Sequence, residues 1–220
     1  MSLTGKIKAA AATDTGMVRE HNEDAIGSDP DLGLLVLADG MGGYNAGEVA
    51  SGIAVKTVLS QVSAALETIP DRNEIEPESG LRRDSIILRD AIFRANRIIH
   101  NTAQTQPDCE GMGTTVVACL FYDNKISVAH VGDSRMYRMR DGNLEQITMD
   151  HSLLQELVDR GFYSKEEALR STNKNYVTRA LGVEPSVDVE VNEAEVVPGD
   201  FYLPTLRSRF RRARDCWGTF

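Results

Sequence analysis

The chain has 220 residues, a formal net charge of -9 at pH 7 and 41% hydrophobic side chains. This composition allows a packed core, and the acidic balance excludes general binding of nucleic acid or anionic membranes by charge. No apolar stretch long enough for a membrane span is present, and the N-terminus lacks the apolar core of a signal peptide. The three widely spaced cysteines fit neither a disulfide framework nor a zinc pattern, which favours a reducing cytosol.

The first third of the chain predicts one buried strand and two long helices. Residues 7–13 predict a short, Ala-rich strand. Residues 33–38 are apolar on both faces, which is typical of a strand buried on both sides. Hydrophobic residues recur at helical spacing over residues 46–66 and again from about Asp84, which we expect to cap the second helix.

The next third changes to short strands separated by tight turns. Asp123-Asn124 and Asp141-Gly142 predict two-residue hairpin turns. The short gaps favour an antiparallel meander, whose strands cover residues 114–122, 125–131, 135–138 and 144–148.

Two short helices and two further strands are expected after the meander. Residues 153–158 predict one helix, and Ser164 with Glu167 forms the capping box of another. Residues 187–191 predict a strand, and a last strand begins at about Asp200. The whole pattern predicts an α+β fold, a four-layer α-β-β-α sandwich of two antiparallel sheets flanked by helices.

Carboxylates carry the chemistry: Asp39 and Asp133 each come directly after an apolar run, and Glu23 and Asp24 are adjacent to each other. Carboxylate and carbonyl oxygens suit Mg²⁺ or Mn²⁺, whereas thiolates and imidazoles suit zinc. Two such ions lower the pKa of a bridging water and clamp an in-line displacement at phosphorus. The guanidinium of Arg19 matches phosphate oxygens in a bidentate way. The candidate ligands are Glu23, Asp24, Asp39, Asp133 and the carbonyl of Gly40.

Other interpretations of these residues remain open. A single Asp at a strand end is more often a turn former or helix cap, and residues 22–24 fit a solvated loop. Gly42-Gly43 is followed by no Gly-Lys-Ser/Thr, so nucleotide binding is disfavoured. No pattern for covalent catalysis stands out. The histidines show no ligand spacing: His21, His100, His130 and His151.

Six motifs in order resemble the metal-dependent protein serine/threonine phosphatases of type 2C. The resemblance runs from about residue 6 to residue 203 and is strongest to the bacterial, single-domain, cytosolic subgroup. The motifs are Thr13-Asp14-Thr15-Gly16 with Arg19 and Asn22-Glu23-Asp24-Ala25, Asp39-Gly40-Met41-Gly42-Gly43, Gly113-Thr114-Thr115, Gly132-Asp133-Ser134-Arg135, Asp150-His151-Ser152 and Thr178-Arg179-Ala180-Leu181-Gly182.

The resemblance implies a role for each candidate. Asp39 would bridge two Mn²⁺ or Mg²⁺ ions and, with Asp24, form the catalytic centre. Gly40 would lend a carbonyl, and Glu23 and Asp24 would act directly or through metal-bound waters. Arg19 would bind the substrate phosphate, and Asp133 would help hold a third, looser metal.

Two further implications concern the surroundings of the centre. Residues 150–181 correspond to a mobile flap beside the cleft. Met41 stands where many eukaryotic relatives have a His that is a candidate general acid, and a thioether cannot donate a proton. Protonation of the leaving group must therefore come from water or another residue.

The C-terminus departs from the family pattern after residue 203. Neither the Ser-Asp-Gly motif nor the terminal Asp-Asn motif follows, and Pro204 with alternating Arg residues is a poor central strand. We expect an incomplete phosphatase domain over residues 1–203 and a basic tail of atypical composition over 204–220. The tail has five Arg against one Asp, and either an out-of-frame read or a natural pseudo-enzyme would produce it.

These features predict an enzyme that hydrolyses phosphoserine and phosphothreonine in proteins, with activity impaired in this chain. We expect phosphorylated proteins and a cognate Ser/Thr kinase as partners, a cytoplasmic monomer, and no nucleic acid or membrane. The alternative is a non-catalytic module, a pseudophosphatase, that binds phosphoproteins without turnover.

Overall fold

A computed structural model of the protein describes residues 3, 5–17, 21–43, 46–68, 74–171 and 176–206. The strands are β1 (Asp24–Asp29), β2 (Leu34–Met41), β3 (Gly113–Thr114), β4 (Val116–Tyr122), β5 (Lys125–Val131), β6 (Arg135–Arg140), β7 (Asn143–Gln146), β8 (Glu190–Glu195) and β9 (Phe201–Thr205). The helices are α1 (Ala46–Thr68), α2 (Arg83–Thr105), the short 3-10 helix η1 (Pro107–Cys109), α3 (Leu153–Asp159) and α4 (Lys165–Arg170).

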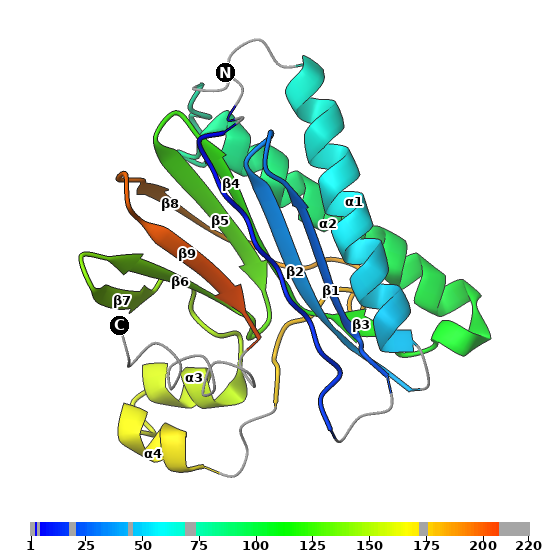
Figure 1. Ribbon diagram of the computed structural model, residues 1–220. Coiled ribbons are helices and arrows are strands. Elements are labelled where there is room, and N and C mark those ends of the chain that lie inside the picture. Colours follow the sequence, from blue (N-terminus) through cyan, green and yellow to red (C-terminus); the bar gives the residue numbers. More distant parts are fainter. Residues whose placement is uncertain are drawn as a thin grey trace.

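The strands form two antiparallel sheets (Figure 1). The large sheet has the order β1-β2-β4-β5-β8, and β3 pairs with the end of β2. The small sheet has the order β7-β6-β9. This arrangement confirms the predicted α+β class with two antiparallel sheets.

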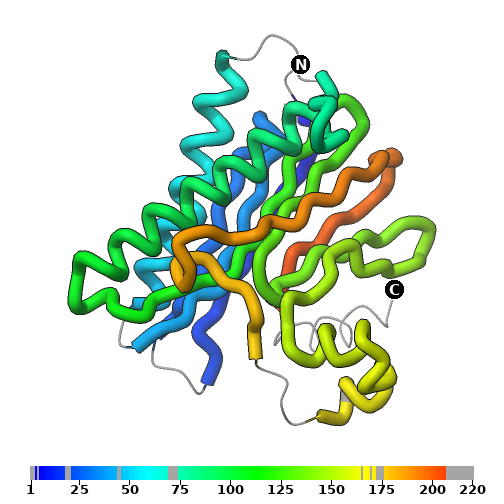
Figure 2. Tube along the Cα trace, turned by 180° about the vertical axis from the view of Figure 1, so that it is seen from behind, coloured from blue at the N-terminus to red at the C-terminus, as the bar shows by residue number. Residues whose placement is uncertain are grey.

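The two long helices cover one face of the large sheet, and the small sheet lies on its other face (Figures 1 and 2). Among the described residues the sandwich therefore has three layers, and the predicted helices over the outer face of the small sheet are not among them. The short helices α3 and α4 lie at one end of the sandwich, below the small sheet in Figure 1.

Alternation along the central strands explains why they are apolar on both faces. In β4, Val116, Ala118 and Leu120 face the helices, whereas Val117 and Cys119 face the small sheet. All five side chains are fully buried. A one-residue slip of register would exchange the two faces, so packing on both sides fixes the pairing of β4 with β2 and β5.

Helix α1 is predicted correctly from its periodicity. Its small buried residues Ala46, Ala50 and Ala54 let it lie close to the sheet. By length and composition alone α1 could cross a membrane. Its contacts with β2 and α2 instead account for its apolar composition as that of a core helix.

The start of α2 differs from the prediction at Asp84. The N-cap is Arg82, which makes no side-chain capping bond, and Asp84 lies within the first turn. Asp84 is fully buried there, so its carboxylate faces the fold and does not cap the helix. The capping box of α4 at Ser164 and Glu167, in contrast, is confirmed.

The predicted strand at residues 7–13 is wrong, and a strand at β1 was missed. A strand needs a ladder partner, and residues 7–13 find none among the described residues; residues 8–13 are exposed. β1 pairs along its full length with β2. Its polar, Gly-containing sequence hides it, and Gly27 is required because a Cβ there would lie 2.5 Å from Cγ1 of Val55 on α1.

The predicted meander is two hairpins that belong to different sheets. β4 and β5 pair in the large sheet, and β6 and β7 pair in the small one. Both predicted turns are confirmed, since Asp123, Asn124, Asp141 and Gly142 have the positive φ of this turn type. The link at residues 132–134, as short as a hairpin loop, instead crosses from one sheet to the other.

The last two predicted strands begin or end later than expected. The strand predicted at residues 187–191 is β8, Glu190–Glu195. β9 runs through Pro204, which lies opposite Met136, and Leu206 is buried in the core between the sheets. The chain thus packs beyond the boundary predicted at residue 203. Residues 207–220 lie outside the described residues, so the division into domain and tail stays a prediction.

Candidate functional site

The register of β1 and β2 brings the two predicted catalytic carboxylates together. Asp24 and Asp39 are direct cross-strand partners, and such partners have Cβ atoms about 4.5–5.5 Å apart on one face of a sheet. Two like charges at this spacing are unfavourable in the absence of a cation. The pair lies at the end of β2 next to β3, the lower end of the large sheet in Figure 1.

The neighbouring predicted ligands Glu23 and Gly40 join this pair through close backbone packing. The amide of Gly40 donates a hydrogen bond to the carbonyl of Glu23, at 3.0 Å. A Cβ at Gly40 would lie 2.6 Å from that carbonyl oxygen and would also overlap the backbone of Gly47 in α1. Only glycine therefore fits at Gly40, and the first turn of α1 lies against this corner of the site.

Thr115 connects Asp39 to the loop that carries Asp133. Its hydroxyl accepts a hydrogen bond from the amide of Asp39 at 3.2 Å and lies 2.7 Å from the hydroxyl of Ser134. Its own amide donates to the carbonyl of Asp39 at 2.9 Å. The partly buried Asp133 is adjacent to Ser134 in the chain. The structure thus brings the Asp133 loop and the Asp24–Asp39 pair to the same end of the large sheet.

Two other sequence predictions have different outcomes. Arg19, the predicted phosphate ligand, lies outside the described residues. Met41 is partly buried at the end of β2, and its Cε would lie 2.8 Å from a Cβ built at Gly113. The thioether therefore packs against β3, beside the predicted metal ligands.

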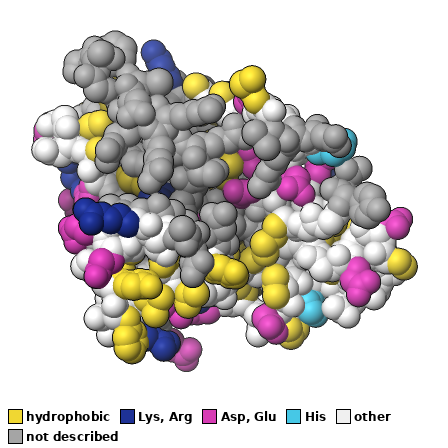
Figure 3. Space-filling model, turned by 90° about the horizontal axis from the view of Figure 1, so that it is seen from below, with side chains coloured by type: hydrophobic (Ala, Val, Ile, Leu, Met, Phe, Trp, Pro, Cys, Tyr) yellow, Lys and Arg dark blue, Asp and Glu magenta, His cyan; other side chains and the backbone are white. Residues whose placement is uncertain are grey.

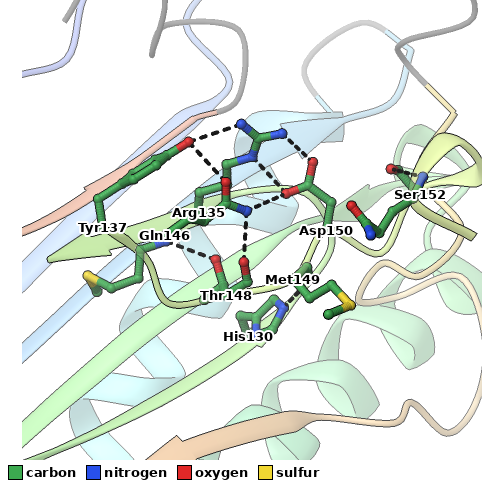
Figure 4. Close-up of polar contacts among 10 residues, drawn as sticks. His130, Arg135, Tyr137, Gln146, Thr148, Met149, Asp150 and Ser152 are labelled. Atoms are coloured by element: carbon green, nitrogen blue, oxygen red, sulfur yellow. Dashed lines mark hydrogen bonds and ion pairs between the residues drawn. The ribbon is translucent and has the colours of Figure 1, made fainter. Parts of the chain in front are cut away.

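A buried ion pair joins the start of β6 to the residues before α3. Nε and Nη2 of Arg135 donate to the two carboxylate oxygens of Asp150, at 2.7 and 2.6 Å (Figure 4). The hydroxyl of Tyr137 accepts from Arg135, and the amide of Gln146 donates to Asp150. Burial lowers the pKa of Arg135, but the hydrogen bonds and charge of Asp150 outweigh it and the net shift is upward. The guanidinium thus stays charged.

Beside this pair, three side chains that the sequence did not single out as a group come together. Ligand atoms of His130, His151 and Glu190 lie within 4.8 Å of one another. The two imidazole rings stack with their centroids 4.6 Å apart. These residues are far apart in the chain, so no spacing could have revealed them.

The hydrogen bonds of this cluster fix both histidine tautomers. Nδ1 of His151 accepts the backbone N–H of Gly132 at 3.1 Å, so its proton is on Nε2, which faces Glu190 at 3.4 Å. Nε2 of His130 donates to the carbonyl of Met149 at 2.7 Å, so Nδ1, which is buried and without a partner, holds the lone pair. With Nε2 protonated, His151 offers no free lone pair to a metal ion. The cluster is therefore a hydrogen-bonded group.

Two pKa shifts agree with this assignment. The hydrogen bond from His151 is the main cause that lowers the pKa of Glu190 to about 2. Burial lowers the pKa of His130, which favours the neutral ring. The cluster thus holds the charged carboxylate of Glu190 near the neutral ring of His130.

Comparison with known proteins decides the family. The model of the family described as protein phosphatase 2C matches residues 17–180. The chain belongs to the protein phosphatase 2C family. It is 40% identical over 181 residues to the serine/threonine phosphatase stp of Listeria welshimeri. The aligned region covers 81% of this chain and 68% of that protein.

A second relative from this family is longer. The serine/threonine protein phosphatase PstP of Mycobacterium tuberculosis is 41% identical over 199 residues, or 90% of this chain but 35% of PstP. A crystal structure of PstP superposes with a TM-score of 0.75 at 38% identity, over 89% of this chain and 76% of that one. The protein phosphatase 2C fold and the class of metal-dependent protein serine/threonine phosphatase are thereby established for the chain.

Proposed function

We propose that this chain removes phosphate from phosphoserine and phosphothreonine side chains of proteins at the Asp24–Asp39 end of the large sheet. The observation that carries the proposal is the cross-strand pairing of the two carboxylates. This pairing sets two carboxylates side by side on one face of the sheet, and the hydrogen bond from the amide of Gly40 to the carbonyl of Glu23 joins the neighbouring residues. The donor set consists of oxygens, which suits Mn²⁺ or Mg²⁺.

The residues present fit two divalent ions. Asp39 would bridge them, and Glu23, Asp24 and the carbonyl of Gly40 would complete the ligands, directly or through water. When bound, the ions supply a water of lowered pKa and offset the charge of the phosphoryl group. A structure of the catalytic domain of PstP that holds two manganese ions supports this assignment, with a TM-score of 0.71 and 37% identity to this chain.

The remaining roles concern the substrate and a looser metal. Asp133 would help to hold a third ion, since its loop is tied through Thr115 to Asp39. Arg19 would bind the substrate phosphate with its bidentate guanidinium. Because Met41 cannot donate a proton, the leaving oxygen would receive one from water or from another residue.

The surface near the site supports a protein substrate. Seen from the end that carries α3 and α4, hydrophobic side chains gather over part of the surface (Figure 3). Large exposed hydrophobic residues of this region are Leu153, Phe162, Tyr163 and Tyr176. A gathering of exposed apolar side chains at this end of the molecule is typical of a surface that binds a polypeptide.

Partners and location complete the proposal. A phosphatase of this class acts on proteins that a kinase has phosphorylated, so the chain would oppose a cognate Ser/Thr kinase. We place it in the bacterial cytoplasm as a signalling monomer. The described cysteines, Cys109 and Cys119, are free and buried, which agrees with a reducing compartment.

The test measures Mn²⁺ binding and the Mn²⁺-dependent hydrolysis of p-nitrophenyl phosphate and of a phosphothreonine peptide. Asp39→Asn replaces the proposed shared carboxylate with a neutral amide, so we expect the Mn²⁺ isotherm to weaken strongly and turnover to fall below about a tenth of the wild-type rate. If the wild-type rate is too low to compare, the Mn²⁺ binding isotherm alone decides the test. The matched control is Asp108→Asn, because Asp108 is exposed and far from β2 in the sequence.

Two outcomes would contradict the proposal. An Asp39→Asn protein with wild-type Mn²⁺ binding and rate removes Asp39 from the metal site. A wild-type chain that binds the phosphopeptide but never hydrolyses it favours the alternative, a phosphoprotein-binding pseudophosphatase.

A further inference from the structure

We propose that His151 is a positioning residue, which holds the loop before Asp133 in place through its Nδ1 atom while Glu190 fixes its tautomer. The inference rests on the proposed role of Asp133 as a metal ligand. It concerns groups that do not touch the predicted metals or the substrate. Their effect on the reaction would pass through the backbone of Gly132.

His151 satisfies both backbone groups of Gly132. Its amide donates to the carbonyl of Gly132 at 2.9 Å, and its Nδ1 accepts from the amide of Gly132 at 3.1 Å. Gly132 has φ +105°, and a Cβ there would lie 2.6 Å from Cγ2 of Thr115. Only glycine therefore fits before Asp133, and His151 supplies hydrogen bonds to both backbone groups of that glycine.

Glu190 and His130 hold the imidazole in the orientation that this contact needs. The Nε2 proton of His151 points to Oε2 of Glu190 at 3.4 Å, and Asn192 donates to the other oxygen of Glu190 at 3.3 Å. On one face the ring of His130 stacks against His151, and His130 is fixed in turn by the carbonyl of Met149. An anionic acceptor at Nε2 favours the tautomer with its lone pair on Nδ1.

His151 also fixes both ends of the segment between residues 152 and 178. Its carbonyl accepts from the amide of Thr178 at 2.9 Å, and the following residue, Ser152, forms a bridge with Val177. The amide of Leu153 donates to the carbonyl of Tyr176. One residue thus joins the Asp133 loop to the base of the segment predicted to form the flap.

Two isosteric variants separate the proposed contact from general packing. In His151→Asn the amide oxygen takes the place of Nδ1, so the acceptor for Gly132 is kept and the donor to Glu190 is lost. In His151→Gln the amide reaches the place of Nε2, so the opposite contact is kept. Isothermal titration with Mn²⁺ and the Mn²⁺ concentration for half-maximal turnover are measured for both, with the melting temperature alongside.

We expect His151→Gln to weaken Mn²⁺ binding at the third, looser site about tenfold or more, as is typical when a group that orients a metal ligand is lost. His151→Asn should stay near the wild-type value. Equal losses of melting temperature with unchanged or equally changed Mn²⁺ binding in the two variants would show a merely structural role and overturn the inference.

Asp133→Asn separates this inference from the proposed function. Where Asp133→Asn binds Mn²⁺ as the wild type does, the metal role of Asp133 fails and the inference fails with it. Where Asp133→Asn binds weakly but His151→Gln does not, the inference alone is wrong. If His151→Gln does not fold, the comparison of Glu190→Leu with Glu190→Gln decides. The leucine variant should bind Mn²⁺ more weakly than the glutamine variant, and equal affinities overturn the role of Glu190.

Discussion

At the scale of single residues, the ion pairs of the protein differ in how far their carboxylates are buried. Asp150 is almost completely buried, with 4% of its side chain exposed, and it is paired bidentately with Arg135. Asp188 is paired with Arg179 but remains 82% exposed. The two ion pairs should therefore contribute very differently to stability.

We expect Asp150→Asn to lower the free energy of unfolding by about 3 kcal/mol, because it leaves the largely buried guanidinium of Arg135, 22% exposed, without its counter-charge. Asp188→Asn should change it by less than about 1 kcal/mol, since water screens the exposed pair. Urea unfolding of both variants checks this. Similar small effects would mean that the Arg135 charge is well solvated in the native state.

Glu190 gives a prediction on pH. Its pKa falls from an ordinary value of 4.5 to about 2 in the folded chain. The unfolded chain therefore takes up the proton first as the pH falls, so the stabilisation by Glu190 is complete above about pH 4.5 and is lost between pH 4.5 and 2.

Glu190→Gln should accordingly be less stable than the wild type at pH 7, and the two stabilities should converge as the pH falls toward 2. Urea unfolding at pH 7, 4.5 and 3 measures this difference. A constant difference at all three values would show that the charge of Glu190 is not the source of its contribution.

At the scale of elements, a prediction from sequence agrees with the structure where the signal for the element lies within the element itself. The spacing of α1 and the turn residues Asp123-Asn124 are local signals, and both are confirmed. Whether residues 7–13 or 24–29 form a strand depends on a partner elsewhere in the chain, so the first segment was wrongly predicted to be a strand and the second was missed. The link at 132–134 has the length of a hairpin loop, so its change of sheet could not be read from spacing.

The site shows the same division. Asp39 and Asp133 could be selected because each lies at the end of an apolar run, and Asp24 because it adjoins a second carboxylate, Glu23. Their convergence required the register of β1 with β2 and the hydroxyl of Thr115, neither of which leaves a pattern in the sequence. The His130–His151 stack had no signal at all, because its members come from separate elements.

The packing of α2 gives a prediction at this scale. Ile92 is fully buried in the core beneath α2, whereas Ile98 on the same helix is 39% exposed. Ile92→Ala should lower the free energy of unfolding by about 2–5 kcal/mol through lost burial and a cavity. Ile98→Ala should cost about 1 kcal/mol or less. Thermal and urea unfolding compare the pair, and equal losses would contradict the assigned face of α2.

At the scale of the whole molecule, the large sheet is shielded on both sides, and one cysteine reports on that shielding. Cys119 lies in the core between the sheets and is fully buried. Burial raises the pKa of its thiol to about 12, so the reactive thiolate does not form at neutral pH. An alkylating reagent also cannot reach the sulfur in the native chain.

Alkylation of Cys119, followed by mass spectrometry, should therefore be very slow in buffer and should accelerate with urea along the global unfolding curve. Cys109 serves as the internal comparison, because it lies in the short helix η1 and is 6% exposed, whereas Cys119 is fully buried. Rapid labelling of Cys119 without denaturant would show that the two sheets separate readily.

The crossing at residues 132–134 has a mechanical consequence. This short link is covalently continuous with β5 in one layer and β6 in the other, and it carries Asp133 between them. Any shear of the small sheet across the large one would move Asp133 relative to Asp39, which lies in β2 of the large sheet. Buried side chains between the two sheets, such as Met136 and Leu206, resist this shear. Their packing thereby helps to keep the spacing of the two carboxylates.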